Sequence, residues 1–333
     1  MKKTVLIPIG DPAGIGPEIV VRALQNRTIY EMCNPVVVGD RAVLERISGI
    51  LDSFVRIRPV NDVNAPCEYA TINLLDVGCL SRNESYSLKF GEISELAGRA
   101  AYSYIKIATD VCLSNSKSCM ATTPINKQAI KLAGICQPGH TEIIANLTGV
   151  VDPLTMFQTN LLRIFFLSRH VSLRQACAMV TYDRVLEYII RSLAALTSLG
   201  LNDGSLAVSG LNPHNSDGGM FGDEEQNIII PAIQAAQSQG CNCVGPIPAD
   251  SVFAAAKLGK YPAVLSLYHD QGHIAAKTLD FHKTISLTIG LPFLRTSVDH
   301  GTGFDIAGQG VANSASMIEA ILAAAKYDYV DVR

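Results

Sequence analysis

The sequence predicts an α/β protein whose largely parallel sheet is divided between two lobes. The chain has 333 residues, 48% hydrophobic and 17% charged, which is enough for more than one core. Short apolar runs rich in β-branched residues alternate with longer segments of helical apolar spacing. This alternation is typical of parallel strands joined by crossover helices.

The individual elements follow from these two patterns. The runs expected to be strands are 4–9, 36–38, 118–121, 161–166, 206–208, 263–267 and 284–288. The segments expected to be helices are 92–111, 184–199, 224–237 and 314–326. A further helix is expected to begin near Pro17, because proline is tolerated at the first helical position. The chain has neither an internal repeat nor a flexible linker, so structured crossings must join the lobes.

Composition argues against several classes of protein. The net charge of -3, with no basic run, disfavours nucleic acid or a membrane surface as partner and favours a small substrate. No apolar run approaches the roughly 20 residues that span a membrane. Pro8 interrupts the first apolar stretch, so we expect no signal peptide. The nine cysteines include no Cys-x-x-Cys pair, and we expect free thiols and a cytoplasmic location.

Three histidines, His170, His214 and His269, each lie just past the end of an expected strand. Strand ends in an α/β sheet open into one crevice, so these imidazoles could meet there. Three neutral imidazoles with a vacant position suit Zn, Co, Mn or Fe(II). A hydrogen-bonded or solvated side chain is the alternative for each, and His273 is the alternative to His269.

Two glycine-rich segments lie at strand ends. Residues 10–18, Gly-Asp-Pro-Ala-Gly-Ile-Gly-Pro-Glu, open a helix and could hold an anion with free N–H groups. They match neither the G-x-G-x-x-G nor the Walker pattern, and glycines that merely permit close packing are an equal alternative. Residues 299–310 suggest backbone packed against a flat ligand, with a surface loop as the alternative.

Four further side chains are candidate anion ligands. His140 and Thr141 begin an expected helix, where the dipole attracts anions, although Thr141 could serve only as a helix cap. Lys277 and Arg295 lie among apolar residues and need a partner for their charge. A phosphate or carboxylate ligand would supply that partner, and so would a structural ion pair.

Taken together, these motifs resemble the 4-hydroxythreonine-4-phosphate dehydrogenase (PdxA) family. The matching segments occur in family order over nearly the whole chain. They are Gly-Asp-Pro-Ala-Gly-Ile-Gly-Pro-Glu at 10–18, Gly-His-Thr-Glu at 139–142, Leu-Asn-Pro-His at 211–214, Gly-Pro-Ile-Pro-Ala-Asp at 245–250, Tyr-His-Asp-Gln-Gly at 268–272 and Gly-Leu-Pro-Phe-Leu-Arg-Thr-Ser-Val-Asp-His-Gly-Thr at 290–302.

The resemblance implies a role for each candidate residue. One divalent metal (Zn, Co, Mn or Mg) would be bound by His170, His214 and His269. The phosphorylated substrate would be contacted by His140, Thr141, Lys277, Arg295 and Ser286, the last standing where an Asn is expected. The cofactor, NAD or NADP, would be bound by Gly301, Thr302, Asp305 and Gly308. The general base is left open between Lys277, Asp270 and a metal-bound water.

The resemblance also implies an architecture of the isocitrate and isopropylmalate dehydrogenase type, with the active site in the cleft between two lobes. The first lobe would comprise 1–125 with 300–333. The second, 126–299, would carry the metal ligands and much of a dimer interface. Such a homodimer would share its active sites between subunits. NAD binds this fold without a Rossmann fingerprint, which accounts for the absence of one.

Motif details favour one branch of the family. Pro-Ile-Asn-Lys at 124–127, Pro-Gly-His at 138–140 and His-Asp-Gln-Gly-His-Ile at 269–274 resemble the D-threonate 4-phosphate dehydrogenases. Ser168-Arg169 also departs from two threonines common in the pyridoxal-pathway enzymes.

We therefore expect metal-dependent, NAD(P)-dependent oxidation of the 3-hydroxyl of a 4-phospho-D-threonate or D-erythronate type of acid, followed by decarboxylation of the β-keto acid. The alternatives are 4-hydroxythreonine-4-phosphate dehydrogenase of pyridoxal phosphate biosynthesis and, from another class, a metal-dependent hydrolase or lyase without NAD. A related acyl transferase or a binding protein would leave the histidines or the cofactor loop unexplained.

Overall fold

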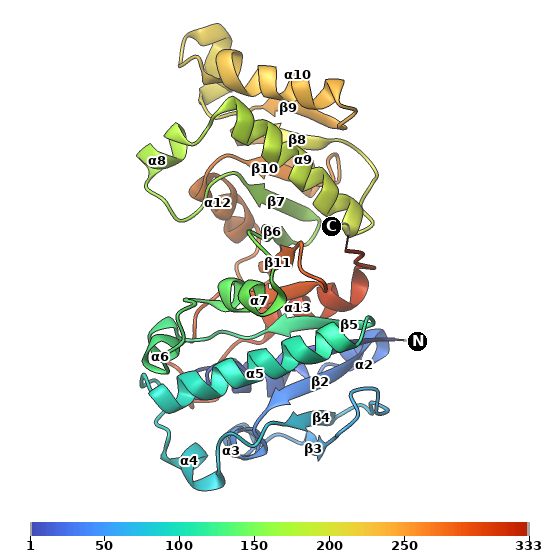
Figure 1. The fold of residues 1–333 in the computed structure, drawn as a ribbon, viewed down its shortest axis with the longest axis vertical. Helices are drawn as coiled ribbons and strands as arrows, with labels where there is room; N and C mark the ends of the chain where they lie inside the picture. The colour runs from blue at the N-terminus through green and yellow to red at the C-terminus, as the bar shows by residue number, and fades with distance from the viewer. Residues whose placement is uncertain (1, 332–333) are drawn as a thin grey trace. The chain divides into compact units, whose positions relative to one another are not determined.

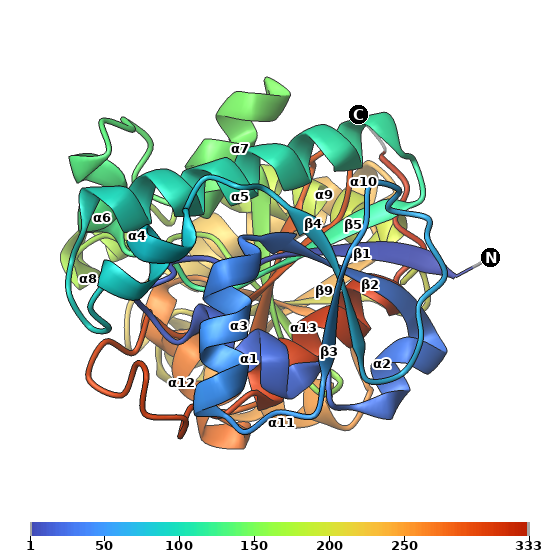
Figure 2. The ribbon, with the colours of Figure 1, turned by 90° about the horizontal axis from the view of Figure 1, so that it is seen from below.

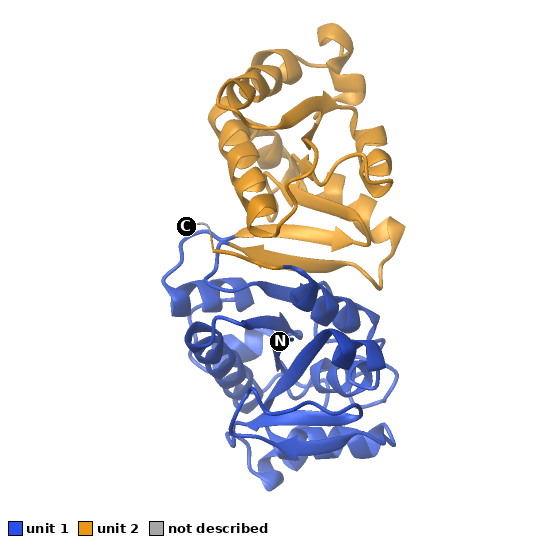
Figure 3. Cartoon of the chain, turned by 90° about the vertical axis from the view of Figure 1, so that its right-hand side faces the viewer, with its two compact units in different colours: residues 1–153, 290–327 blue, residues 154–289, 328–333 orange. Residues whose placement is uncertain are grey.

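A computed structural model describes residues 2–331 and divides them into two compact units. The first unit comprises residues 2–153 with 290–327, and the second comprises 154–289 with 328–331 (Figure 3). These boundaries differ from the expected lobes, because residues 126–153 and 290–299 pack in the first unit. The reason is that this part of the chain supplies two helices that pack on a long helix, and a strand that extends the first unit's sheet.

The first unit is built on parallel strands in the order β3-β4-β2-β1-β5-β12 (Figure 1). The strands are β1 Lys3–Pro8, β2 Cys33–Gly39, β3 Arg56–Pro59, β4 Thr71–Asp76, β5 Ser118–Thr122 and β12 Arg295–Val298. The helices are α1 Gly16–Ala23, α2 Arg27–Met32, α3 Arg41–Ile50, α4 Arg82–Ser87, α5 Glu95–Ser114, α6 Lys127–Leu132, α7 His140–Thr148 and α13 Ala315–Lys326. The expected α/β class with a mostly parallel sheet is confirmed.

The second unit has the strand order β11-β6-β7-β10-β8-β9. Its strands are β6 Leu154–Thr159, β7 Leu162–Phe166, β8 Leu206–Ser209, β9 Cys243–Ile247, β10 Val264–Ser266 and β11 Ile285–Ile289. Its helices are α8 Leu173–Ala178, α9 Tyr182–Ser198, α10 Ile230–Ser238, α11 Ala249–Lys257 and α12 His269–Leu279, with a 3₁₀ segment at Pro213–Gly219 and a π segment at Glu225–Ile229. Strand β6 is antiparallel to both of its neighbours, whereas β7, β10, β8 and β9 run parallel.

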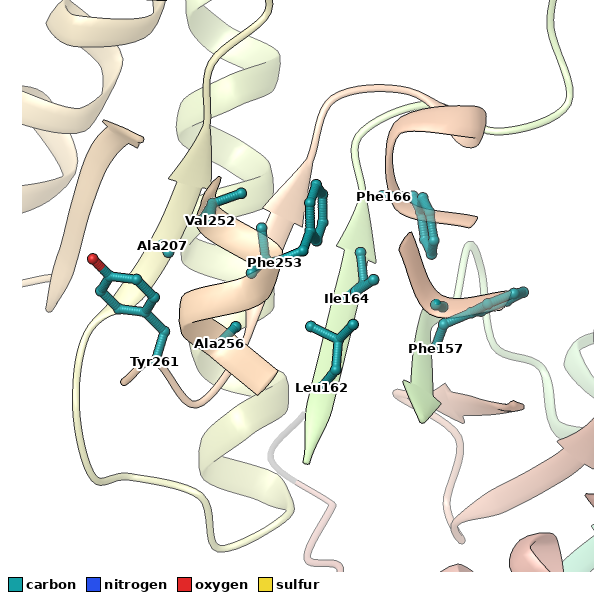
Figure 4. Packing of buried hydrophobic residues seen from close by; sticks show 11 residues of the cluster. Phe157, Leu162, Ile164, Phe166, Ala207, Val252, Phe253, Ala256 and Tyr261 are labelled. Atoms are coloured by element: carbon teal, nitrogen blue, oxygen red, sulfur yellow. The ribbon is translucent and has the colours of Figure 1, made fainter. Parts of the chain in front are cut away.

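The core of the second unit lies between its sheet and helices α11 and α12 (Figure 4). Phe157 and Phe166 meet edge to face at 5.2 Å between ring centroids. Both rings also contact the His273 imidazole on α12. Burial of each such aromatic side chain contributes about 1.5–3 kcal/mol. The core therefore fixes α12 against β6 and β7, and with it the start of α12 at His269.

In the first unit the two glycine-rich segments pack against each other. The Ile15 amide donates to the Thr302 carbonyl at 2.9 Å, and the Gly308 amide donates to buried Glu18 Oε1 at 2.6 Å. A Cβ at Gly14 would lie 2.9 Å from the Thr302 carbonyl oxygen. Close packing is therefore one reason for the glycines at 10–18.

Among the helices of residues 2–331, none combines the length and apolar character of a membrane span.

Helix α6 lies against α5 near the amino-terminal end of α5 (Figure 2), and Gly98 makes this contact possible. A Cβ at Gly98 would lie 2.0 Å from the Ala129 carbonyl oxygen, which is an impossible distance.

We predict that Gly98→Ala lowers the free energy of unfolding by about 1–3 kcal/mol, measured by urea denaturation. The matched control is Gly49→Ala on α3, where a Cβ meets no atom within 4 Å. The control should be neutral or stabilising, and equal losses in the two variants would contradict this packing.

Candidate active site

A buried arginine organises the candidate anion site of the first unit. Arg295, the first residue of β12, has 6% of its surface exposed. Its Nε and Nη2 donate to Thr122 Oγ1 at 3.0 and 2.8 Å, and its Nη1 donates to Thr141 Oγ1 at 3.3 Å. These contacts arise because β12 pairs with β5, whose last residue is Thr122. We call Arg295, Thr122, Thr141 and His140 the arginine site.

Helix α7 presents its amino terminus at this site. Its N-cap is Gly139, so no side chain caps the first N–H groups of the helix. The Nε2 atom of His140, the first helical residue, is buried and has no hydrogen-bond partner within residues 2–331. Free amides, a hydroxyl and a fixed guanidinium are the donors that bind phosphate or carboxylate. The structure thus places His140, Thr141 and Arg295 together, as an anion site requires.

The charges of the arginine site follow from its burial. Burial and the nearby Arg295 hold the pKa of His140 well below its usual value, so the imidazole is neutral at pH 7. Burial lowers the pKa of Arg295 to about 10, while Glu142 acts to raise it. The guanidinium therefore remains charged at neutral pH. A bound anion would gain from this charge at short range.

In the second unit the three predicted metal ligands lie at the same end of the sheet. Strands β7, β10 and β8 are parallel neighbours, and His170, His269 and His214 follow their carboxyl ends. The rings of His170 and His269 lie 6.0 Å apart between centroids. Within residues 2–331 no three His, Cys, Asp or Glu side chains are gathered in a metal-binding arrangement. The topology thus fits a histidine site, and the side chains bring two of its members side by side.

His214 lies in a segment of unusual backbone. Residues 214–218 all have positive φ, between 43° and 69°. Such conformations are costly for residues other than glycine and cluster at ligand-binding segments. The Asn215 side chain anchors this segment by donating to the Pro246 carbonyl at 2.8 Å.

The surroundings of His269 distinguish it from His273. His269 Nδ1 bonds to Asp270 Oδ1 at 2.6 Å, which fixes the tautomer and leaves Nε2 available as a ligand. His273 Nδ1 instead bonds to the His269 carbonyl at 2.9 Å, and its ring stacks on that of His269. Burial lowers the pKa of His273 to about 4. His273 is thus a neutral core side chain, and Asp270 orients His269.

A pocket of about 490 Å³ opens beside this pair of histidines. It is lined in part by Arg169, His170, Tyr268, His269 and Asp270. This volume lies within the range of about 300–1,000 Å³ typical of small-molecule sites. The pocket therefore leaves room for a ligand next to the imidazoles.

The other predicted residues of the second unit lie on α12 and β11. Lys277 is on α12 with its Nζ 5.4 Å from the centre of the Phe281 ring. Ser286 in β11 is paired in register with Phe157 of β6, whose ring contacts His273. Lys277 thus shares α12 with His269, whereas Ser286 lies in the strand next to β6. Ser286 is half-buried, and nothing in the structure explains the hydroxyl in place of an amide.

The predicted cofactor loop is anchored to the first unit at two of its four residues. The Thr302 carbonyl accepts from Ile15, and the Gly308 amide donates to Glu18. Gly301 has no atom within 4 Å of the position of a Cβ, and Asp305 is exposed. The anchored loop thus leaves Gly301 and the Asp305 carboxylate accessible to a ligand.

Sequence reasoning did not identify two polar residues of the first unit. Thr122 holds the Arg295 guanidinium, and its only signal is a hydroxyl at the end of an expected strand. Asp11 is 1% exposed and its Oδ1 accepts from the Ala13 amide at 2.8 Å. Burial raises the pKa of Asp11 to about 6. In the sequence, the only indication that Asp11 could be functional was its place in the 10–18 motif.

The comparisons with known proteins point to one family. Residues 31–324 match the family described as pyridoxal phosphate biosynthetic protein PdxA. A Clostridium botulinum (strain Hall) protein, provisionally named D-threonate 4-phosphate dehydrogenase, is 51% identical over 327 residues, covering 98% of this chain and 97% of that protein.

Two crystal structures of 4-hydroxythreonine-4-phosphate dehydrogenases are also similar to this chain. The enzyme from Klebsiella pneumoniae has a TM-score of 0.89 and 38% identity, covering 98% of each chain. The enzyme from Burkholderia phymatum has a TM-score of 0.86, with the same identity and coverage.

We predict that anion binding at the arginine site takes up a proton at His140. The imidazole is neutral in the free site, and a bound anion stabilises its charged form, so the pKa of His140 rises in the complex. Affinity for sulfate, which does not titrate near neutrality, should therefore increase as the pH falls from 8 to 6. Calorimetry would measure this, with His140→Asn as the variant that loses the slope. A flat wild-type profile, or an equal slope in the variant, would contradict the assignment.

We predict that His170 and His269 are needed for metal retention and that His273 is not. His170→Ala and His269→Ala should lose bound Zn²⁺ or Co²⁺ on dialysis, measured by elemental analysis. His273→Leu, which keeps an apolar side chain between Phe157 and Phe166, should retain it. Loss of metal in His273→Leu together with retention in His269→Ala would reverse the assignment.

Proposed function

The chain belongs to the family of the pyridoxal phosphate biosynthetic protein PdxA, and from this premise we propose that it is a metal-dependent, NAD-dependent dehydrogenase of a four-carbon 4-phosphorylated acid. The substrate is of the D-threonate or D-erythronate 4-phosphate type. The observation that carries this proposal is the 51% identity, over 98% of the chain, with relatives named for D-threonate 4-phosphate oxidation.

A second candidate is the oxidation of 4-hydroxythreonine 4-phosphate. It is favoured by the similarity to crystal structures of enzymes with that name. The two substrates differ at carbon 2, which carries a hydroxyl in threonate and an amino group in hydroxythreonine. Identity to those enzymes is 38%, against 51% for the threonate relatives. The larger value favours the 2-hydroxy acid.

In this proposal the arginine site holds the substrate phosphate. Arg295 supplies a fixed positive charge, and Thr122 and Thr141 keep its guanidinium in place. The first amides of α7 and the His140 imidazole supply further hydrogen bonds. Each charge-assisted hydrogen bond contributes about 1.5–3 kcal/mol, which holds the carbon chain in one orientation.

His170, His214 and His269 would hold the divalent metal, which is Zn, Co, Mn or Mg. When bound, the metal supplies Lewis acidity that lowers the pKa of the substrate hydroxyl. Asp270 holds His269 in the tautomer that leaves Nε2 free for this role. The proposal includes a homodimer that shares its active sites between subunits, as the family resemblance implies.

The oxidation removes a proton from the 3-hydroxyl and a hydride from carbon 3. NAD accepts the hydride. Lys277 is the candidate general base that accepts this proton, because it lies two turns beyond His269 on the same helix. The resulting β-keto acid loses its carboxyl group as carbon dioxide, and carbon 2 takes up a proton.

The cofactor loop supports NAD rather than NADP in this proposal. Asp305 is an exposed residue of the anchored loop. A carboxylate accepts hydrogen bonds from a ribose diol and repels the 2′-phosphate of NADP. Gly301 leaves open space at the start of the same loop.

We predict metal-dependent formation of NADH from D-threonate 4-phosphate, followed by its absorbance. The value of kcat/KM should exceed that for 4-hydroxythreonine 4-phosphate by about ten- to two-hundredfold. D-threonate without its phosphate should be turned over at least about tenfold less efficiently. A higher value for the amino acid would support the second candidate. Turnover without a nicotinamide cofactor would place the chain with hydrolases or lyases instead.

A further inference from the structure

A lysine that the proposed function leaves without a role lies close to the arginine site. Lys127 is the first residue of α6 and is exposed. Its Cε lies 3.9 Å from the position that a Cβ would take at Gly139. Gly139 is the N-cap of α7, directly before His140 and Thr141. Lys127 therefore reaches the same helix terminus as the arginine site.

The backbone of Lys127 is held firmly although its side chain is exposed. The preceding Asn126 caps α6, since its Oδ1 accepts from the amides of Gln128 and Ala129 at 2.9 and 3.0 Å. The backbone N–H of Asn126 donates to the buried Asp11 carboxylate. The close approach of α6 to α5 at Gly98 holds the other side of the helix. A ligand would thus meet an ammonium group whose side chain extends from a firmly held backbone.

Helix stability does not account for a lysine at this position. The positive end of a helix dipole disfavours a cation, and the first turn of α6 contains no acidic residue to offset it. Within residues 2–331, the Lys127 side chain forms neither an ion pair nor a hydrogen bond. The Glu142 carboxylate is nearby, with Oε2 3.0 Å from the same Cβ position at Gly139. The ammonium group is therefore available to a bound anion.

The charge of a phosphate monoester also calls for a second cation. The ester carries about 1.5–2 negative charges at pH 7. Arg295 supplies one positive charge, and three of its N–H groups are already committed to Thr122 and Thr141. Glu142 adds a negative charge at the same helix terminus. With Arg295 and the proton that His140 takes up on one side and Glu142 on the other, the arginine site offsets only part of the ligand's charge.

We propose that Lys127 is a further ligand of the substrate phosphate, an inference that rests on the proposed function of the arginine site. The guanidinium of Arg295 holds the phosphate from the buried side. The Lys127 side chain reaches it from the exposed side and supplies a further positive charge. A phosphate monoester dianion is thus bound between two cations and the first amides of α7.

The test is the affinity of the full-length chain for inorganic phosphate, measured by calorimetry without substrate or NAD. Lys127→Ala should weaken phosphate binding about tenfold, whereas Lys127→Arg should remain within about threefold of the wild type. The matched control is Lys131→Ala, which removes an exposed lysine from the last turn of the same helix. It should leave the affinity unchanged. In turnover, Lys127→Ala should raise KM for the phosphorylated substrate more than it lowers kcat.

Equal affinities of the wild type and Lys127→Ala would overturn the proposal, as would equal losses in Lys127→Ala and Lys131→Ala. A wild-type chain that binds no phosphate would also overturn it. The proposed function would fail separately if the chain formed no NADH but still bound phosphate through Lys127. Thermal denaturation checks folding, and the melting temperature of Lys127→Ala should not fall below that of the wild type.

Discussion

The burial of the Arg295 guanidinium is the constraint on which the first unit's site depends. Removing a charge from water costs several kcal/mol unless hydrogen bonds and an opposite charge compensate. Two threonine hydroxyls supply hydrogen bonds, one from the end of β5 and one from the first turn of α7. The pairing of β12 with β5 brings these parts of the chain together. The fold thus builds a fixed cationic site from parts of the chain that lie far apart in the sequence.

The second unit solves a different problem, which is to place three imidazoles at the same end of a sheet. Parallel strands β7, β10 and β8 end side by side, and each is followed by one of the three histidines. The aromatic core that encloses His273 also fixes the first turn of α12, where His269 lies. In the proposed function, these histidines would hold a Lewis-acidic metal and the arginine site of the first unit would hold the substrate phosphate.

Much of this arrangement could be predicted from the sequence, because strongly apolar runs and helical spacing identify β1, β2, β10, α5 and α13. Strand β12 could not, because its Arg-Thr-Ser-Val sequence looks polar while all four residues are buried. Its Thr296 hydroxyl donates to the Ala320 carbonyl of α13 at 2.8 Å, which makes that burial possible. The β6–β7 hairpin was likewise predicted only as one strand, since its turn depends on a positive φ at Asn160.

The site shows the same division between local and distant information. The histidines and Arg295 were predicted from strand ends and unusual surroundings. Thr122 was not, because its role depends on a contact with β12 that lies far along the chain, and the approach of Lys127 to Gly139 depends on how α6 and α7 fold. The unit boundaries differ from the expected lobes for the same reason, since the pairing of β12 with β5 assigns residues 290–299 to the first unit.

Isotope transfer from carbon 3 tests the central claim most directly. D-threonate 4-phosphate carrying deuterium at carbon 3 would be oxidised by the metal-loaded chain with NAD, and the reduced cofactor analysed by mass spectrometry. The account predicts one deuterium per molecule in the nicotinamide ring, together with release of carbon dioxide. Reduced cofactor without deuterium, or product formed without reduced cofactor, would contradict it.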